Sequence, residues 1–237
     1  MSADRSVPGP LIGAGRSADV YDIGGDRVLR RYRDPSASAE REAAVMRWLA
    51  GAGYPVPVVY DADGPDLVMG RLDGPTLRGS MAARPWTLWS AGTLLAGLHQ
   101  RLHALDASQL AASGIVGRRA GEGDQLVHLD LHPENVILTA DGPVVIDWAN
   151  VAIGDGAFDV AYVWAVLAIA TLPGRGADRL LNAVGRRVLR RSFLRHFDRA
   201  ACGRALVRLV DEGAVSVRNF DAVEMARLGE LVESLRD

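Results

Sequence analysis

The stretch His128-Leu129-Asp130-Leu131-His132-Pro133-Glu134-Asn135, followed by Ile146-Asp147-Trp148, decides the fold of this chain. It places an aspartate, an asparagine five residues later and a second aspartate twelve residues after that. Between the last two, two apolar runs flank a turn signal, which predicts two short strands joined as a hairpin. These segments are Val136-Ile137-Leu138, Asp141-Gly142-Pro143 and Val144-Val145-Ile146. We therefore expect a polar loop, a hairpin and an acidic residue where the hairpin ends.

The chemistry that needs these three side chains in this order is phosphoryl transfer. Asp130 would take the proton of an acceptor hydroxyl as the catalytic residue. Asn135 and Asp147 would supply oxygen ligands to Mg²⁺ on the nucleotide phosphates. The alternative is a hairpin with incidental polar residues, and the N-terminal features described below, which follow in kinase order, favour the chemistry.

The phrases HLDLHPENVIL (128–138) and VVIDW (144–148) resemble the aminoglycoside phosphotransferase and choline kinase family, small-molecule relatives of protein kinases. The likeness extends from about residue 11 to about residue 165. Asp147 is followed by Trp148 and Ala149 where protein kinases have D-F-G, which favours the small-molecule branch. The resemblance implies an α+β, bilobal protein-kinase-like fold. It would have an antiparallel-sheet N-lobe over residues 1–72 and a helical C-lobe with the acceptor site over residues 73–237.

A Gly-rich turn lies near the N-terminus, in LIGAGRSADVY (11–21). It fits G-x-G-x-x-G-x-V except that Ala18 replaces the third glycine. Glycines let backbone amides approach phosphate oxygens, although many ordinary hairpin turns also carry two glycines. We expect Gly13, Gly15 and Ser17 to lie at the phosphates, and the resemblance implies that Val20 covers the adenine.

The following predicted strand, Arg27–Tyr32, matches the strand that carries a phosphate-binding lysine in kinases. The chain contains no lysine at all, since its 27 basic residues are all arginine. The resemblance places Arg30 at the lysine position, with Arg31 as the alternative. A guanidinium group keeps the positive charge of the lysine but offers a planar fork in place of a point charge.

Two further segments complete the expected nucleotide site. The amphipathic helix 38–49 carries Glu42, which the resemblance matches to the partner of the phosphate-binding cation. Glu40 is the alternative partner. The other interpretation is that Glu42 is an exposed surface carboxylate. Residues 69–72 are the expected hinge, where Met69, Gly70 and Leu72 would bind adenine through their backbone.

Bulk properties exclude several classes of function. The chain has 237 residues, a net charge of −2 and a pI near 6.2, so it offers no overall positive charge to nucleic acid. The single cysteine, Cys202, cannot form an internal disulfide, and residues 1–10 contain no apolar signal segment. The apolar run 160–172 is too short to span a bilayer. We expect a cytoplasmic protein, a monomer or homodimer, without membrane or nucleic-acid partners.

The C-terminal half is predicted to be mainly helical, and four of its features could bear on function. His99 and His103 lie one turn apart in a helix predicted over 86–106, a spacing typical of zinc sites but more often of packed histidines. Asp159, at the start of the next helix, is expected to hold either the catalytic loop or the helix start by hydrogen bonds. The segment 177–199 is predicted to have an apolar face, formed by Leu180, Leu181, Val184, Val188, Phe193 and Phe197. Its other face is arginine-rich, either solvated or built for an anion or partner. Three acidic residues could suit a cationic acceptor: Asp155, Asp211 and Glu212.

The sequence thus predicts a Mg²⁺-dependent kinase of a small hydroxyl-bearing molecule, such as an aminoglycoside, amino-alcohol or sugar. ATP is the expected phosphoryl donor, with GTP as the alternative. The rival interpretation is a nucleotide-binding regulatory module without turnover, motivated by Arg30 and by the incomplete Gly-rich motif.

Overall fold

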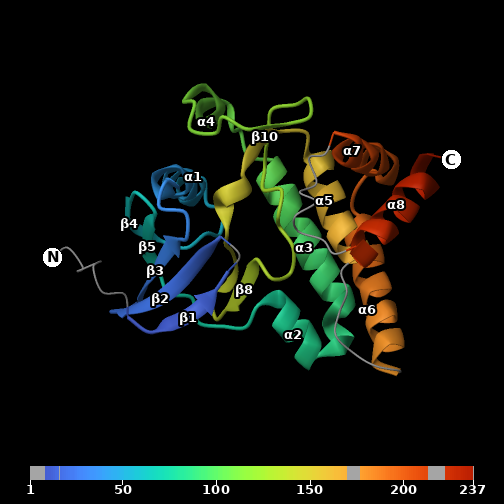
Figure 1. Ribbon diagram of the computed structural model, residues 1–237, viewed down its shortest axis with the longest axis horizontal. Helices are drawn as coiled ribbons and strands as arrows, with labels where there is room; N and C mark the ends of the chain where they lie inside the picture. The colour runs from blue at the N-terminus through green and yellow to red at the C-terminus, as the bar shows by residue number, and fades with distance from the viewer. Residues whose placement is uncertain (1–8, 16, 170–176, 213–221, 237) are drawn as a thin grey trace.

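The computed structural model describes residues 9–15, 17–169, 177–212 and 222–236, and Figure 1 shows their arrangement. An antiparallel sheet with one helix forms the N-terminal part, and a group of helices forms the C-terminal part. Between them lie short strands and the loop predicted to be catalytic. The expected α+β, bilobal class is confirmed, while the division at residues 72 and 73 stays a prediction.

The N-terminal sheet has the strand order β1-β2-β3-β5-β4, with every neighbouring pair antiparallel. The turn between β2 and β3 is tight because Gly25 and Asp26 both have positive φ, as two-residue hairpins require. Helix α1 buries Ala43, Val45 and Leu49. The elements are β1 (Leu11–Ala14), β2 (Ala18–Gly24), β3 (Arg27–Tyr32), α1 (Ala39–Gly51), β4 (Val59–Asp63) and β5 (Asp66–Gly70).

The chain then enters the helical part through a connector that lies against a second hairpin. Gly74 has φ +153°, and a Cβ atom there would lie 2.0 Å from the carbonyl oxygen of Leu138. The amide of Leu138 also donates to the carbonyl of Pro75 at 2.9 Å. Only glycine fits so close to a neighbouring backbone. This contact fixes the end of the N-terminal sheet to the hairpin that carries the predicted site.

The helical part surrounds α3 and α5. Helix α5 is apolar on nearly every side because α3, α6, α7 and α8 all pack on it. The helices are α2 (Leu77–Ala83), α3 (Leu88–His103), α4 (Ser108–Ala112), α5 (Gly156–Ile169), α6 (Ala177–Leu194), α7 (Arg199–Asp211) and α8 (Ala222–Arg236), with short 3₁₀ turns at Pro85–Thr87 and Trp148–Asn150.

Five short strands connect these helices. Strands β6 (Arg119–Ala120), β10 (Ala152–Gly154) and β7 (Gln125–Val127) form a small sheet in the order β6-β10-β7, and β8 (Val136–Thr139) pairs with β9 (Gly142–Val145). The hairpin predicted between Asn135 and Asp147 is therefore confirmed. The register pairs Val136 with Val145, so the two ends of the hairpin meet.

Two expectations need correction. The helix predicted over 86–106 begins at Leu88, because Pro85 starts a separate 3₁₀ turn. Val184, predicted on the apolar face of 177–199, is 51% exposed, and Leu189 is buried in that helix instead. Leu180 and Leu181 of the same face lie outside the side chains that the structure describes.

Over the described ranges, no helix is long and apolar enough to cross a membrane.

Candidate active site

The predicted catalytic loop, residues 128–135, lies between β7 and β8 and is anchored by Asp159 of α5. The Asp159 carboxylate accepts backbone hydrogen bonds from His128 at 3.1 Å and Leu129 at 2.7 Å. It also accepts a bond from Nε2 of His103 at 2.9 Å. Leu129 is held at φ +61°, a left-handed conformation that a leucine adopts only when its surroundings enforce it. The expectation that Asp159 holds the loop is confirmed.

Asp159 is fully buried, yet it remains a carboxylate. Burial alone would raise its pKa, but the hydrogen bond from His103 and the neighbouring histidines hold the pKa well below its usual value. His99 packs beside His103 with its Nδ1 against the carbonyl of Leu95. Burial lowers the pKa of His99 to about 4. The two histidines are thus packed residues, which is the more common interpretation of their spacing.

Asp130 projects from this loop with 21% of its side-chain surface exposed. Its Oδ1 lies 3.3 Å from Nε2 of His132. Because Nδ1 of His132 lies 3.2 Å from the amide of Glu134, which donates to it, the proton of a neutral ring sits on Nε2 and faces Asp130. One carboxylate oxygen of Asp130 therefore lies beside the imidazole of His132.

Asn135 closes the loop and connects it to Asp147. Its Nδ2 donates to the carbonyl of Asp130 at 2.8 Å, so its side-chain oxygen remains available as an acceptor. Its own carbonyl accepts from the amide of Ile146 at 3.0 Å, which places the next residue, Asp147, beside it. Asp147 has φ +66° and ψ +68°, and 34% of its side-chain surface is exposed. The structure therefore brings the two predicted metal ligands to one end of the hairpin.

Arg30 joins the N-terminal sheet to this end of the hairpin. It forms an ion pair with Glu42 of α1, and its second guanidinium nitrogen lies 2.6 Å from Oδ1 of Asp147. Glu42 also accepts from the Tyr32 hydroxyl and from the amide of Trp148 at 3.0 Å. Burial would lower the pKa of Arg30, but the two carboxylates outweigh it and raise the pKa above its ordinary value.

The alternatives to this pair have other partners. Arg31 binds Asp66 at 2.7 Å on the outer side of the sheet. Glu40 accepts from the Ser38 hydroxyl at 2.7 Å and from the amide of Gly64 at 2.7 Å. The predicted pairing of Arg30 with Glu42 is thus the one that the structure contains.

The Gly-rich turn connects β1 and β2. The amide of Gly15 donates to the carbonyl of Ala18 at 2.8 Å, and a Cβ atom at Gly15 would lie 2.9 Å from that oxygen. Val20 is opposite Gly13 on one side and opposite Arg30 on the other. Residues paired across strands share a face of the sheet, so Val20 and Arg30 lie on the same face. The carbonyl of Ser17 accepts from the amide of Arg33 at 2.9 Å.

The predicted hinge follows β5. Met69 belongs to the sheet, opposite Val28 and Val59. The amide of Gly70 donates to Val58 at 2.8 Å, and Leu72 lies just beyond the strand. The adenine contacts of this segment stay a prediction.

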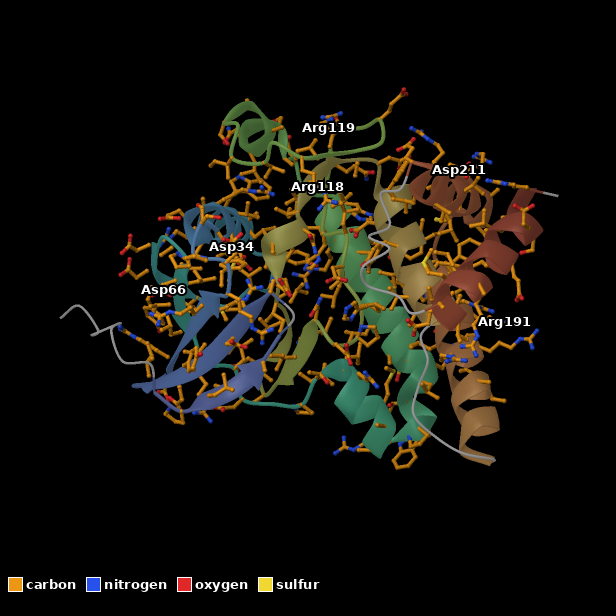
Figure 2. All side chains as sticks on the ribbon, viewed as in Figure 1. Asp34, Asp66, Arg118, Arg119, Arg191 and Asp211 are labelled. Carbon is orange, nitrogen blue, oxygen red and sulfur yellow. The ribbon has the colours of Figure 1, made fainter. Side chains whose placement is uncertain are left out.

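The three acidic residues considered for a cationic acceptor have partners of their own. Asp155 accepts from the amide of Ala157 at 2.8 Å, where α5 begins. Glu212 pairs with Arg208, and Asp211, labelled on α7 in Figure 2, pairs with Arg236. They act in helix ends and surface ion pairs, and nothing in the described contacts joins them to the catalytic loop.

Sequence reasoning missed two parts of this site. His132 stands two residues after Asp130 in the opening motif but was given no role. His103 was considered only as a zinc ligand or a packed histidine, although it supports Asp159. For His132 a signal was available, because an imidazole stands two residues from the expected base. For His103 no local signal was available, because Asp159 lies 56 positions away in the sequence.

Comparisons with known proteins agree with this geometry. The model of the phosphotransferase enzyme family, APH, matches residues 9–115 and 101–201. The chain belongs to this family. The predicted resemblance is confirmed, and with it the prediction of a small-molecule kinase. No curated protein matches the chain in sequence.

Solved structures share the fold at low sequence identity. A choline/ethanolamine kinase family protein from Mesorhizobium loti is 18% identical with a TM-score of 0.56, over 99% of this chain and 90% of that chain. ADP-bound aminoglycoside phosphotransferase APH(2″)-Ib is 14% identical with a TM-score of 0.57, over 94% and 91% of the two chains. The streptomycin–ATP ternary complex of APH(2″)-IIa is 15% identical with a TM-score of 0.57, over 94% and 92%. At these identities the likeness shows the fold alone.

Proposed function

We propose that this phosphotransferase moves the γ-phosphoryl group of ATP, as its Mg²⁺ complex, to a hydroxyl group of a small molecule. The observation that carries the proposal is one continuous network, in which Asn135 links Asp130 to the hairpin and Arg30 links Asp147 to Glu42. Related solved structures contain ADP, or ATP with streptomycin, which supports a nucleotide and a hydroxyl-bearing acceptor. GTP is the alternative donor.

Asp130 is the proposed proton acceptor. The acceptor hydroxyl gives its proton to the carboxylate while its oxygen forms a bond to the γ-phosphorus. The bond from that phosphorus to the β–γ bridging oxygen breaks, and ADP leaves with the electron pair. His132 lies beside one oxygen of Asp130 and would hold it, so that the other oxygen faces the acceptor hydroxyl.

Asn135 and Asp147 are the proposed metal ligands. The Asn135 side chain uses its nitrogen on Asp130, which leaves its oxygen, and Asp147 has one carboxylate oxygen beyond the one bound by Arg30. Hard oxygen ligands of this kind fit Mg²⁺, which usually completes its coordination with phosphate oxygens and water. No cluster of three or more His, Cys, Asp or Glu side chains suited to a metal exists in the described ranges, so the nucleotide would supply the remaining ligands. Bound Mg²⁺ would neutralise charge on the phosphates.

The remaining assignments follow from the position of Arg30. With Glu42 as its fixed partner, Arg30 can release Asp147 and bind nucleotide phosphates, beside Gly13, Gly15 and Ser17. Val20 would lie against the base, and Met69, Gly70 and Leu72 would contact it through the backbone. In this scheme residues 1–72 form the nucleotide-covering lobe and residues 73–237 carry the acceptor site.

Asp130→Asn is the decisive test. Purified protein is screened for Mg²⁺-dependent phosphorylation of a panel of amino-alcohols, aminoglycosides and sugars, with ATP and with GTP. The variant should lose roughly 10²- to 10⁴-fold in turnover, the usual contribution of a general base, while its thermal stabilisation by Mg-ATP stays unchanged. Asp141→Asn, in the exposed hairpin turn, is the matched control and should retain full turnover.

Turnover of Asp130→Asn at the wild-type rate would contradict the mechanism. Nucleotide-dependent stabilisation without turnover on any acceptor would favour the rival regulatory module. Absence of stabilisation by either nucleotide at millimolar concentration would contradict both interpretations.

A further inference from the structure

A hollow of about 200 Å³ lies between α5 and α6, outside the site described above. Leu167 and Ala168 form its α5 side, and Ala183 belongs to its α6 side. The rest of its lining is three arginines of α6: Arg186, Arg187 and Arg190. They belong to the arginine-rich face that the sequence left as either solvated or built for an anion.

These three arginines lie close enough to one another for their charges to repel. Arg190 is a half-buried cation whose pKa is lowered by burial first and then by Arg187, Arg199 and Arg186. The pKa of Arg186 is lowered by burial and then by Arg227 of α8. In the described part of the chain, no carboxylate pairs with Arg187 or Arg190. Elsewhere carboxylates neutralise seven arginines: Arg30, Arg31, Arg33, Arg71, Arg78, Arg208 and Arg236.

The helix places the three guanidinium groups together. Arg186 and Arg190 are four residues apart and Arg187 and Arg190 are three apart, so all three lie on one side of α6. Like charges at these spacings destabilise a helix, and removing them partly from water adds to the cost. Like charges held close together lower the stability of the ligand-free protein. A bound anion would offset this repulsion and stabilise the protein.

We propose that Arg186, Arg187 and Arg190 form a binding site for a small oxyanion that carries phosphate or carboxylate groups. Guanidinium groups bind such groups through paired hydrogen bonds. The hollow is smaller than the roughly 300–1,000 Å³ typical of drug-sized ligands, which suits a single anionic group. None of its lining residues takes part in the proposed nucleotide site, so the inference extends beyond the proposed function.

Two sources could supply this anionic group. Helix α5 carries Asp159, which anchors the catalytic loop, and eight residues later it carries Leu167 in the hollow. At 1.5 Å per residue, that is roughly 12 Å along the helix. This distance suits either an acid group on the phosphoryl acceptor or a separate anion bound to the same helix. The shared chemistry is the oxyanion, and the experiment distinguishes the two.

The test uses the full chain at constant ionic strength, with a non-hydrolysable ATP analogue and Mg²⁺ present to fill the nucleotide cleft. Inorganic phosphate and citrate are titrated, and binding is followed by thermal shift and calorimetry. Arg187→Gln and Arg190→Gln should each weaken the apparent affinity on the order of tenfold, the loss of one charge-assisted contact. Arg191→Gln is the matched control, since Arg191 is exposed on the same helix (Figure 2).

Stability without ligand is the second measurement. Arg190→Gln should leave the Tm of the free protein unchanged or raised, because one member of a repelling cluster is removed. Saturable binding in the wild type, weakened in Arg187→Gln and Arg190→Gln but not in Arg191→Gln, supports the site. Equal weakening in all three variants, absence of saturation in the wild type, or a lowered Tm of free Arg190→Gln would overturn it.

Kinetics then assign the source of the anion. With an acceptor found in the screen, competition by phosphate and a raised acceptor KM in Arg190→Gln place the acid group on the acceptor. Inhibition or activation by phosphate without a change in acceptor KM assigns a separate anion. Both results retain the site, and phosphate without effect on binding or kinetics would reject it, whether or not the proposed kinase mechanism holds.

Discussion

Two buried carboxylates, Glu42 and Asp159, support the site in opposite ways. Glu42 is 4% exposed and binds a cation, a hydroxyl and one backbone amide, from Arg30, Tyr32 and Trp148. Asp159 is fully buried and accepts two consecutive backbone amides of the catalytic loop and one imidazole nitrogen. The first carboxylate binds mainly side chains, and the second binds mainly the backbone of the loop.

The difference indicates which part of the site can change on binding. A guanidinium group that bridges Glu42 and Asp147 can exchange the more exposed partner for phosphate without moving the backbone. Amides bound by Asp159 fix the left-handed turn at Leu129, and with it the direction of Asp130. In the proposed function, the nucleotide side would therefore adjust on binding, whereas the loop that carries Asp130 is preset.

The largest expected effect tests the preset side. Asp159→Ala leaves two buried amides and His103 without their acceptor, and we expect a loss of about 3–5 kcal/mol in the free energy of unfolding. Urea denaturation measures it. Asp155→Ala, which removes only a helix-start hydrogen bond, should cost about 1 kcal/mol. Equal losses in the two variants would contradict the anchoring role of Asp159.

The second prediction concerns acid sensitivity on the same side. His99 faces Asp159, His103 and His128, and its folded-state pKa of about 4 lies below the ordinary value of 6.5. The unfolded chain therefore binds the proton more readily, so His99 contributes stability near neutral pH that is lost as pH falls from 6.5 towards 4. The loss approaches about 3 kcal/mol at most, at 1.36 kcal/mol per pKa unit.

Denaturation measured at several pH values in His99→Phe checks this effect. The slope of stability against pH should flatten in that window. Phe193→Leu, a packing change beside the same ring, should lower stability at every pH and keep the slope. A wild-type slope in His99→Phe would show that another group carries the acid sensitivity.

The third prediction tests the adjustable side. Arg30→Gln removes the charge shared between Glu42 and the phosphates, and Mg-ATP affinity should fall roughly 10- to 100-fold. Arg30→Lys keeps the charge but loses the planar fork that bridges Glu42 and Asp147, so its affinity should fall less than that of Arg30→Gln. Calorimetry with Mg-ATP measures both. Unchanged affinity in Arg30→Gln would exclude Arg30 as the phosphate contact.

The smallest expected effect tests the contact between His132 and Asp130. His132→Ala removes the donor that positions Asp130, and kcat should fall about tenfold, equivalent to 1.4 kcal/mol, with the nucleotide KM unchanged. His132→Gln can place an N–H near the same point and should restore most of the rate. If glutamine gives no rescue, or if KM changes instead of kcat, then His132 does not act through Asp130.

The sequence alone determined the order, along the chain, of the segments that contribute the site residues. The spacing of Asp130, Asn135 and Asp147 around a hairpin is local information, because strand alternation and turn residues are written within a few positions of each other. The Gly-rich turn, the strand of Arg30 and the helix of Glu42 were located for the same reason. The fold class came from the resemblance of these segments to a family of small-molecule kinases.

The tertiary structure decided which side chains come into contact, how deeply they are buried and which charges surround them. Arg30 and Asp147 are 117 residues apart, and Glu42 and Trp148 are 106 apart. The sequence left the arginine-rich face of α6 as either solvated or built for an anion or partner. In the structure its middle lines a hollow, and Val184 is exposed to solvent. Local patterns set helix and strand faces, but ion-pair choice and burial depend on what the rest of the chain packs against each face, and no local pattern contains that information.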